Sequence, residues 1–331
     1  MGKIMMGKSK LGYGKYILEE FKFDSGQVLN DVEVEYTTRG TPEYDEDGNI
    51  SNAVIFCHSF NGNCLSIGDL HQLIGPESEL SDLNFFYISI TTLGYPESCS
   101  PSTTDLKYDF PKYSINDCLN FKRKFLAEAF NITKVVGIIG MGIGGYETFT
   151  WACEYPDDME FIIIIASSFK TNGYRYIVSK TLNSIIESSD SYFDSVYSEN
   201  LSKVMLSINS LIYSQYLPKR VFQNFTRDEI DLYMDSFIED GFSIDIYDFK
   251  FRNTAILDYD VEDRLSDIKA KTLIFSASED IYYTPEFDTY PPKDKIENIE
   301  ISIFDAQNFV YNEDYSKFID PFREFLEEFK K

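Results

Sequence analysis

The stretch Gly140-Met-Gly-Ile-Gly-Gly145 follows an apolar run and precedes a helical pattern, which is typical of a turn that joins a strand to a helix. Its glycines fit G-x-G-x-x-G, in which the backbone approaches a dinucleotide pyrophosphate at a helix N-terminus. The same residues fit the nucleophile elbow G-x-S-x-G, in which a sharp turn holds a reactive side chain above a sheet. In that alternative the middle residue is Gly142, so the reactive side chain is missing.

Other residue types that could do chemistry are scarce. The chain has two histidines, His58 and His71, and five cysteines that form no C-x-x-C pair. Zinc sites in proteins are built mainly from such residues, so we expect no metal site. An odd number of cysteines also fits reduced thiols in a cytosol better than a disulfide framework.

Composition excludes several classes of partner. The 331 residues include 55 acidic and 30 basic side chains, a formal net charge of −25 that would repel nucleic acid and anionic membranes. This charge fits either an ordinary solvated surface or adaptation to high internal salt. The first ten residues lack the apolar run of a signal peptide, and the longest apolar run, Phe161 to Ala166, is too short to span a bilayer. We therefore expect a cytoplasmic protein without nucleic-acid or membrane partners.

Apolar runs that alternate with helical patterns predict an α/β fold with a mostly parallel sheet. The following runs are typical of strands buried on both faces: Ala53 to Cys57, Asn84 to Ile90, Val135 to Ile139, Phe161 to Ala166, Thr272 to Ser276 and Glu300 to Phe304. Helices are predicted over Ile115 to Phe130, Gly144 to Tyr155 and Tyr315 to Phe329, and an antiparallel hairpin over Tyr16 to Thr38. From Phe169 to about Arg264 the sequence holds only amphipathic segments, which indicates a helical insertion.

The position of the glycine turn favours the elbow. A dinucleotide fold places its fingerprint after the first strand and an acidic residue about 20 positions later. Here a hairpin and two parallel strands precede Val135, and the next strand ends in Ile165-Ala-Ser-Ser168 with no carboxylate. An elbow is expected after several strands, with an acid and a histidine following later ones.

The chain resembles the homoserine O-acetyltransferase branch of the α/β-hydrolase fold. Cys57-His-Ser-Phe-Asn-Gly62 resembles that branch's oxyanion loop H-A-L-T-G, and Gly140 to Gly145 falls on its G-G-S-M-G-G. The further segments that match in order are Thr92-Leu-Gly94 with Ser100-Pro-Ser102, Trp151-Ala-Cys-Glu-Tyr-Pro-Asp157, Ala255-Ile-Leu-Asp-Tyr-Asp-Val261, Asp280-Ile-Tyr-Tyr-Thr-Pro-Glu286 and Asp305-Ala-Gln-Asn-Phe309. The similarity covers nearly the whole chain, the insertion included.

This resemblance implies an α/β-hydrolase core at residues 1–170 and 265–331, with a helical lid at 171–264. It also implies acetyl-CoA as an acyl donor, a small-molecule ligand, and a homodimer that forms through the lid. Acyl transfer by the family's route needs an oxygen nucleophile, a base, an acid that orients the base, and two backbone N–H groups for the oxyanion.

Two of these groups are missing at the matching positions. Gly142 occupies the nucleophile position and Ala306 that of the histidine, which becomes Gln307 if the alignment shifts by one. The acid is retained as Asp280, and by analogy the N–H groups of Phe60 and Ile143 remain as oxyanion donors. The resemblance therefore leaves open whether the chain is an enzyme.

Residues that could replace the missing groups have simpler interpretations. By resemblance His58 packs the oxyanion loop, and His71 is expected on a helix at the surface. Cys57 and Cys64 flank the loop and are interpreted as buried, inert thiols. The resemblance also implies that the family's homoserine-binding groups are absent, since an expected acid falls on Gln307 and an expected lid arginine on Ser214.

Three hypotheses follow. The first is a binding or regulatory protein on this scaffold, without Ser-His-Asp chemistry. The second is an acyltransferase or hydrolase with rearranged groups, in which the oxyanion donors and Asp280 act on water or on the substrate. The third, the least favoured, is a dinucleotide-dependent oxidoreductase.

Overall fold

The computed structural model describes residues 11–215, 217, 219–305 and 316–330, and its centre is one eight-stranded sheet in the order β1-β2-β4-β3-β5-β6-β7-β8. The strands are β1 Leu11–Lys22, β2 Val28–Arg39, β3 Ala53–Cys57, β4 Phe86–Ile90, β5 Val135–Met141, β6 Met159–Ile165, β7 Lys271–Ala277 and β8 Ile299–Phe304. From β4 to β8 all neighbours pair in parallel, whereas β1 and β2 form an antiparallel hairpin that joins the sheet through β4. The α/β prediction is confirmed.

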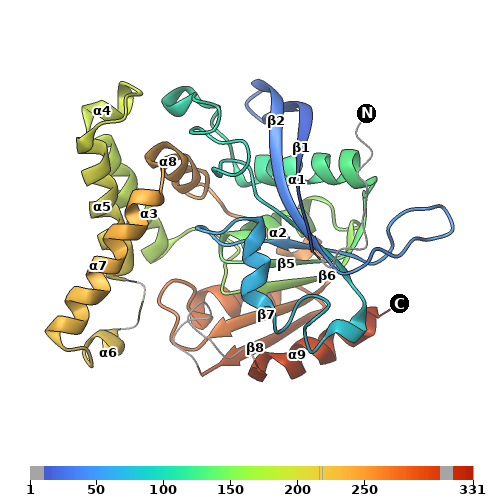
Figure 1. Ribbon diagram of the computed structural model, residues 1–331. Coiled ribbons are helices and arrows are strands. Elements are labelled where there is room, and N and C mark those ends of the chain that lie inside the picture. The colour runs from blue at the N-terminus through green and yellow to red at the C-terminus, as the bar shows by residue number, and fades with distance from the viewer. Residues whose placement is uncertain (1–10, 216, 218, 306–315, 331) are drawn as a thin grey trace.

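Helices cover both faces of the parallel strands. Figure 1 shows α1 (Ile115–Phe130) on one side of the sheet and α9 (Ser316–Leu326) on the other. Phe121 and Phe125 of α1 belong to one buried cluster, and Phe322 of α9 belongs to the second. Because both faces are covered, β3, β4 and β5 are buried along their whole lengths, which explains their uninterrupted apolar sequences.

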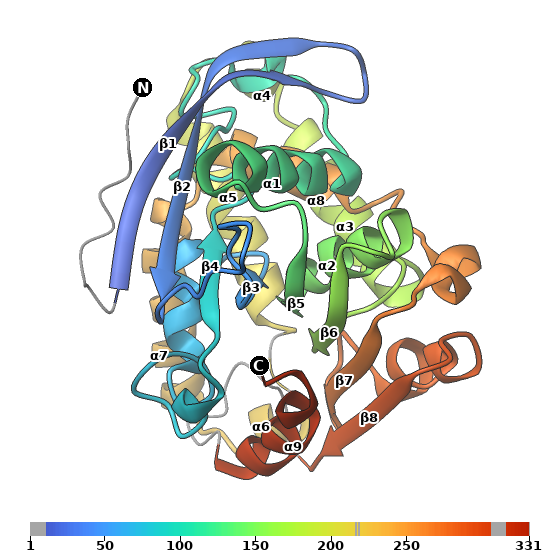
Figure 2. The ribbon, with the colours of Figure 1, turned by 90° about the vertical axis from the view of Figure 1, so that its right-hand side faces the viewer.

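The N-terminal hairpin extends far beyond the rest of the sheet (Figure 2). Its register runs from Leu11 opposite Arg39 to Lys22 opposite Val28. β2 pairs with β4 over four residues at its C-terminal end, Tyr36 to Arg39. The remaining length packs against α1, where the Phe21 and Phe121 rings lie 5.7 Å apart.

Among the described residues, six α-helices and one 3-10 helix, Glu262–Asp267, lie between β6 and β7, the interval in which the sequence predicts the lid. The α-helices form most of it. They are α3 Gly173–Glu187, α4 Asp190–Phe193, α5 Glu199–Tyr213, α6 Lys219–Phe222, α7 Arg227–Ser243 and α8 Ile246–Ala255. Figure 1 shows these elements grouped beside the sheet, and α3, α5 and α8 share a buried cluster of their own. We refer to α3 to α8 as the insertion. No helix among the described residues has both the length and the apolar character that crossing a bilayer requires.

Two local predictions were wrong. The strand over Glu300 to Phe304 forms, but it is half-buried rather than covered on both faces, because β8 is the edge strand of the sheet. The segment around His71 is not an α-helix: a 3-10 helix spans Cys64–Leu70 and stops at His71, which is exposed. The connection between β3 and β4 instead holds two 3-10 helices, Cys64–Leu70 and Ser81–Leu83.

Candidate active site

The glycine turn lies at the carboxyl end of β5, where α2 (Ile143–Glu154) begins. Gly142 adopts φ 57° and ψ −121°, a left-handed conformation that residues with a side chain rarely adopt. A Cβ built there would meet its nearest neighbour, Cβ of Ser59, at 3.5 Å, which is ordinary contact. The turn therefore has the strained geometry and the open space of an elbow, but no reactive side chain.

The last glycine of the motif has a packing role. A Cβ at Gly145 would lie 2.2 Å from Oγ of Ser167, so any side chain would push α2 away from the loop that follows β6. Ser167 in turn donates a 2.6 Å hydrogen bond to the carbonyl of Gly142. Close packing of α2 explains this glycine without a bound pyrophosphate.

His58 belongs to the loop after β3, with both ring nitrogens engaged by the backbone. Nε2 accepts the N–H of Thr92 at 3.1 Å, which places the ring proton on Nδ1, the donor to the Ser59 carbonyl at 2.9 Å. Burial lowers the pKa of His58 to about 3, so the ring is neutral at physiological pH. A neutral ring with both nitrogens occupied cannot serve as the missing base, and it fixes the loop in place.

The oxyanion loop is also held from the insertion. Arg252 of α8 donates from Nη1 to the Phe60 carbonyl at 3.1 Å, and its guanidinium lies 4.3 Å from the Tyr95 ring centroid. Phe60 and Ile143 both line the cavity described below. Within the described part of the chain, neither N–H donates a hydrogen bond, so both remain available to an acceptor.

A buried polar network lies beneath the elbow. Lys122 of α1 and Glu147 of α2 form an ion pair, with both side chains almost inaccessible to solvent. The second oxygen of Glu147 accepts the Thr92 hydroxyl at 2.9 Å. Since Thr92 also donates its N–H to His58, the network links α1 and α2 to the oxyanion loop.

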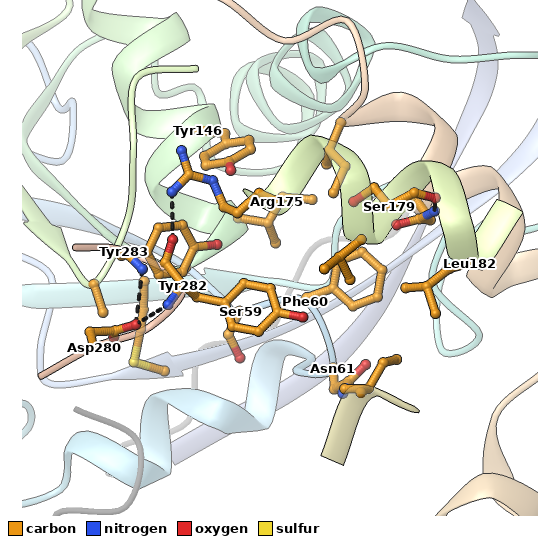
Figure 3. A pocket seen from close by; sticks show the side chains of 18 of the residues that line it. Ser59, Phe60, Asn61, Tyr146, Arg175, Ser179, Leu182, Asp280, Tyr282 and Tyr283 are labelled. Atoms are coloured by element: carbon orange, nitrogen blue, oxygen red, sulfur yellow. Dashed lines mark hydrogen bonds between the residues drawn. The ribbon is translucent and has the colours of Figure 1, made fainter. Parts of the chain in front are cut away.

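Asp280, the residue at the position of the family's acid, lies in the loop after β7. Asp280 is buried, and its Oδ1 accepts the N–H groups of Tyr282 at 2.8 Å and Tyr283 at 2.9 Å (Figure 3). Burial raises the pKa of Asp280 to about 6, although the two backbone hydrogen bonds act in the opposite direction. The family's catalytic histidine falls on Ala306, or on Gln307 if the alignment shifts by one, and both residues lie outside the described residues.

A cavity of about 190 Å³ brings these residues together between the sheet and the insertion. Asp280, Gly142, Phe60 and Ile143 line it, as do residues of α3 that sequence reasoning missed. Among these is Arg175, which forms an ion pair of 2.8 Å with Asp288. No local pattern marked Arg175, because its position depends on how α3 folds back over the sheet.

The other residues weighed from the sequence lie apart from this cavity. Ser214 follows the end of α5 and is exposed. Burial raises the pKa of both Cys57 and Cys64 to about 12, which leaves them as thiols at neutral pH. Among the described residues, no group of three or more acidic, histidine or cysteine side chains is placed to hold a metal ion.

The comparison with known families identifies this architecture. The profile of the family described as alpha/beta hydrolase fold matches residues 52–315. The chain belongs to this family. A probable acyltransferase of Methanothermobacter thermautotrophicus is 38% identical over 303 residues, which cover 92% of this chain and 93% of that protein.

Homoserine acyltransferases are more distant relatives of this α/β hydrolase. The homoserine O-acetyltransferase of Methanosalsum zhilinae is 26% identical over 82% of this chain, and the match spans 62% of that protein. The structure of homoserine O-acetyltransferase from Bacillus anthracis superposes with a TM-score of 0.84 over 96% of this chain and 98% of that one, at 18% identity. The α/β hydrolase described here is therefore homoserine O-acetyltransferase-like, and the oxidoreductase alternative is set aside.

Proposed function

We propose that this chain is a ligand-binding or regulatory member of the homoserine O-acetyltransferase-like branch, without the Ser-His-Asp acyl transfer of its relatives. The observation that carries the proposal is that Gly142, which has no side chain to act as a nucleophile, lies at the elbow and lines the cavity. The surrounding hydrogen bonds stabilise the shape of the site, but no hydroxyl stands at the elbow. A cavity without its nucleophile is suited to binding.

The expected activity is close to background. Removing the nucleophile of a serine hydrolase costs about a millionfold in turnover, whereas the oxyanion hole and binding alone can retain about a thousandfold over water. A panel of esters and acyl-CoA thioesters, acetyl-CoA included, tests this directly. Robust turnover together with covalent labelling by a fluorophosphonate would refute the proposal, and the labelled residue would identify the nucleophile.

Rebuilding the site offers a sharper test. The double change Gly142→Ser with Ala306→His should restore a Ser-His-Asp set if Asp280 and the two N–H donors keep their ancestral geometry. Each single change should do little, because nucleophile and base act as a unit. We expect a burst on a small activated ester from the double variant alone. A folded double variant with its new hydroxyl bonded to the new imidazole, yet without a burst, would show that the scaffold no longer supports catalysis.

A second candidate is an acyltransferase or hydrolase with rearranged catalytic groups. Two observations favour it: the 38% identical relative is named a probable acyltransferase, and Ser59 lies in contact distance of the bare elbow. In this alternative the Phe60 and Ile143 N–H groups stabilise an oxyanion while Ser59 or water attacks. Labelling at Ser59, lost in Ser59→Ala, would support it over the binding role.

We extend the proposal to a cytoplasmic protein that pairs with itself, or with an active relative, through the insertion. All five cysteines are buried and unpaired, which suits a reducing compartment. Exposed apolar side chains of the insertion, Ile177 and Leu232 among them, support the dimer. Light scattering measures the oligomeric state of the wild type, expected as a dimer, and of Ile177→Glu, expected to dissociate. A wild type that is monomeric at all concentrations would contradict the proposed dimer.

A further inference from the structure

The cavity contains two charged side chains among the described residues, and one of them is already neutralised. Arg175 forms an ion pair with Asp288 and donates a 2.8 Å hydrogen bond to the carbonyl of Lys170. It also donates a 2.6 Å hydrogen bond to the carbonyl of Tyr282, and its guanidinium faces the Tyr283 ring (Figure 3). Its charge and its two terminal nitrogens are therefore engaged by the protein, and Nε alone is buried without an acceptor among the described residues. Arg175 orders the acid loop and is a poor receptor for an anion.

Asp280 is the other charged residue, and one of its two carboxylate oxygens accepts no hydrogen bond from the described residues. It is 6% exposed, and Oδ1 accepts both backbone hydrogen bonds. No described residue donates to Oδ2, although an ionised carboxylate offers about four acceptor positions. Because Asp280 lines the cavity, a ligand there can donate to Oδ2, and a hydrogen bond to a charged group is stronger than one between neutral groups.

The remaining wall of the cavity is largely apolar and aromatic. Phe60, Tyr146 and Phe249 contribute rings, and Val178 and Leu182 of α3 contribute aliphatic groups. Such a wall binds an apolar body, and tyrosine and phenylalanine faces attract a cation in their vicinity. The formal charge of −25 also draws cations toward the protein.

We propose that this cavity binds a small organic ammonium ion, with its charged nitrogen on the Asp280 carboxylate and an apolar or aromatic body against α3 and the oxyanion loop. This inference rests on the proposed binding function and gives its ligand a chemical class. The rival occupant is a carboxylate at the free N–H groups of Phe60 and Ile143, at the start of α2. Charge decides between them, since Asp280 lines the same cavity and repels an anion.

Three probes of nearly equal size separate these possibilities: benzylamine, benzyl alcohol and benzoate, each titrated into the full chain by calorimetry at pH 8. A hydrogen bond to a charged partner predicts that benzylamine binds about ten- to a hundredfold more tightly than benzyl alcohol. Asp280→Asn should abolish this preference. The control is Glu279→Gln, which removes one negative charge from the neighbouring residue. The Glu279 carboxylate pairs with Arg220 at the surface and does not line the cavity, so this variant should keep the preference for benzylamine.

Acidification provides an independent readout. Burial raises the pKa of Asp280 to about 6, against the two backbone hydrogen bonds, while Asp288 raises it and Arg175 lowers it. The carboxylate therefore loses its charge as the pH falls below that value. The preference for benzylamine over benzyl alcohol should therefore shrink between pH 8 and pH 5 in the wild type. In Asp280→Asn it should not change.

The outcomes bear differently on this inference and on the proposed function. Tighter binding of benzoate than benzylamine, or an ammonium preference that survives in Asp280→Asn, would overturn the inference and leave a binding role in place. Binding of none of the three probes would overturn the inference. Fluorophosphonate labelling with ester turnover would instead overturn the proposed function, whatever the probes do.

Discussion

The elbow side of the cavity, around Gly142, and the acid side, around Asp280, lie after the carboxyl ends of β5 and β7 in the same sheet. The two sides differ in how many of their polar groups have partners within the protein. At the elbow, His58 and Glu147 have their partners within the protein, and Lys122 pairs with Glu147. On the acid side, Asp280 keeps one oxygen without a described donor. The elbow has no side chain at Gly142 but is surrounded by polar groups with partners, whereas the acid side has a carboxylate that no described side chain contacts through a hydrogen bond.

This difference separates stability from binding. A satisfied buried network holds secondary elements together, and breaking it should cost folding free energy. A buried carboxylate whose pKa is raised by burial does the reverse, because the folded state carries the desolvation cost of its charge. Substitutions on the two sides should therefore change stability in opposite directions.

The largest effect is expected at the buried ion pair. Lys122→Met leaves Glu147 charged and unpaired in the core, which should lower the free energy of unfolding by about 3–5 kcal/mol. Urea denaturation of the wild type and the variant measures this difference in the free energy of unfolding. Lys124→Met on the same helix breaks the more exposed pair with Glu128 and should cost about 0.5 kcal/mol or less. Equal losses in the two variants would contradict the account of the elbow side.

Asp280→Asn should stabilise the protein at pH 8, by on the order of 1–3 kcal/mol, because the amide still accepts both backbone N–H groups and has no charge to bury. The pKa of Asp280 is raised from 3.8 to about 6, so the cost of its charge is present above pH 6 and disappears as the pH falls toward 3.8. The gain should vanish over that interval. Denaturation at pH 8, 6 and 4 tests this, and a destabilised variant at pH 8 would show that the carboxylate has a partner.

Gly142→Ser should destabilise the protein by about 1–3 kcal/mol, since a side chain at φ 57° and ψ −121° introduces backbone strain. Space is sufficient, because a Cβ would make its closest contact at 3.5 Å. Gly142→Ala is the matched control and should cost about as much. If Ala is tolerated and Ser is not, the penalty comes from the hydroxyl rather than from the backbone.

The smallest effect is expected for Ser59→Ala. The Ser59 carbonyl, rather than its hydroxyl, accepts the hydrogen bonds from His58 and Gly62, so stability should change by about 0.5 kcal/mol or less. Any background ester hydrolysis should also remain. A clear loss of turnover in this variant would favour the rearranged-enzyme alternative over a binding role.

The sheet was largely predictable because its signal is local. Strands buried on two faces require continuous apolar runs, and β3 was placed to the residue at Ala53–Cys57. The helix α1 was also predicted to the residue, from its periodicity over Ile115–Phe130. The edge position of β8 was missed, because an apolar run does not reveal whether a neighbouring strand covers it.

The sequence by itself determined that residue 142 is a glycine without a reactive side chain and that Asp280 follows the predicted strand Thr272 to Ser276, since both follow from residue identity and order. Tertiary structure decided what surrounds them. Folding brings α3 over the sheet, so that Arg175 neutralises Asp288, and it places both nitrogens of His58 against backbone groups. Two of these pairings, His58 with Thr92 and Arg175 with Asp288, join residues that lie 34 and 113 positions apart. No sequence pattern specifies such contacts, because they depend on the packing of whole elements.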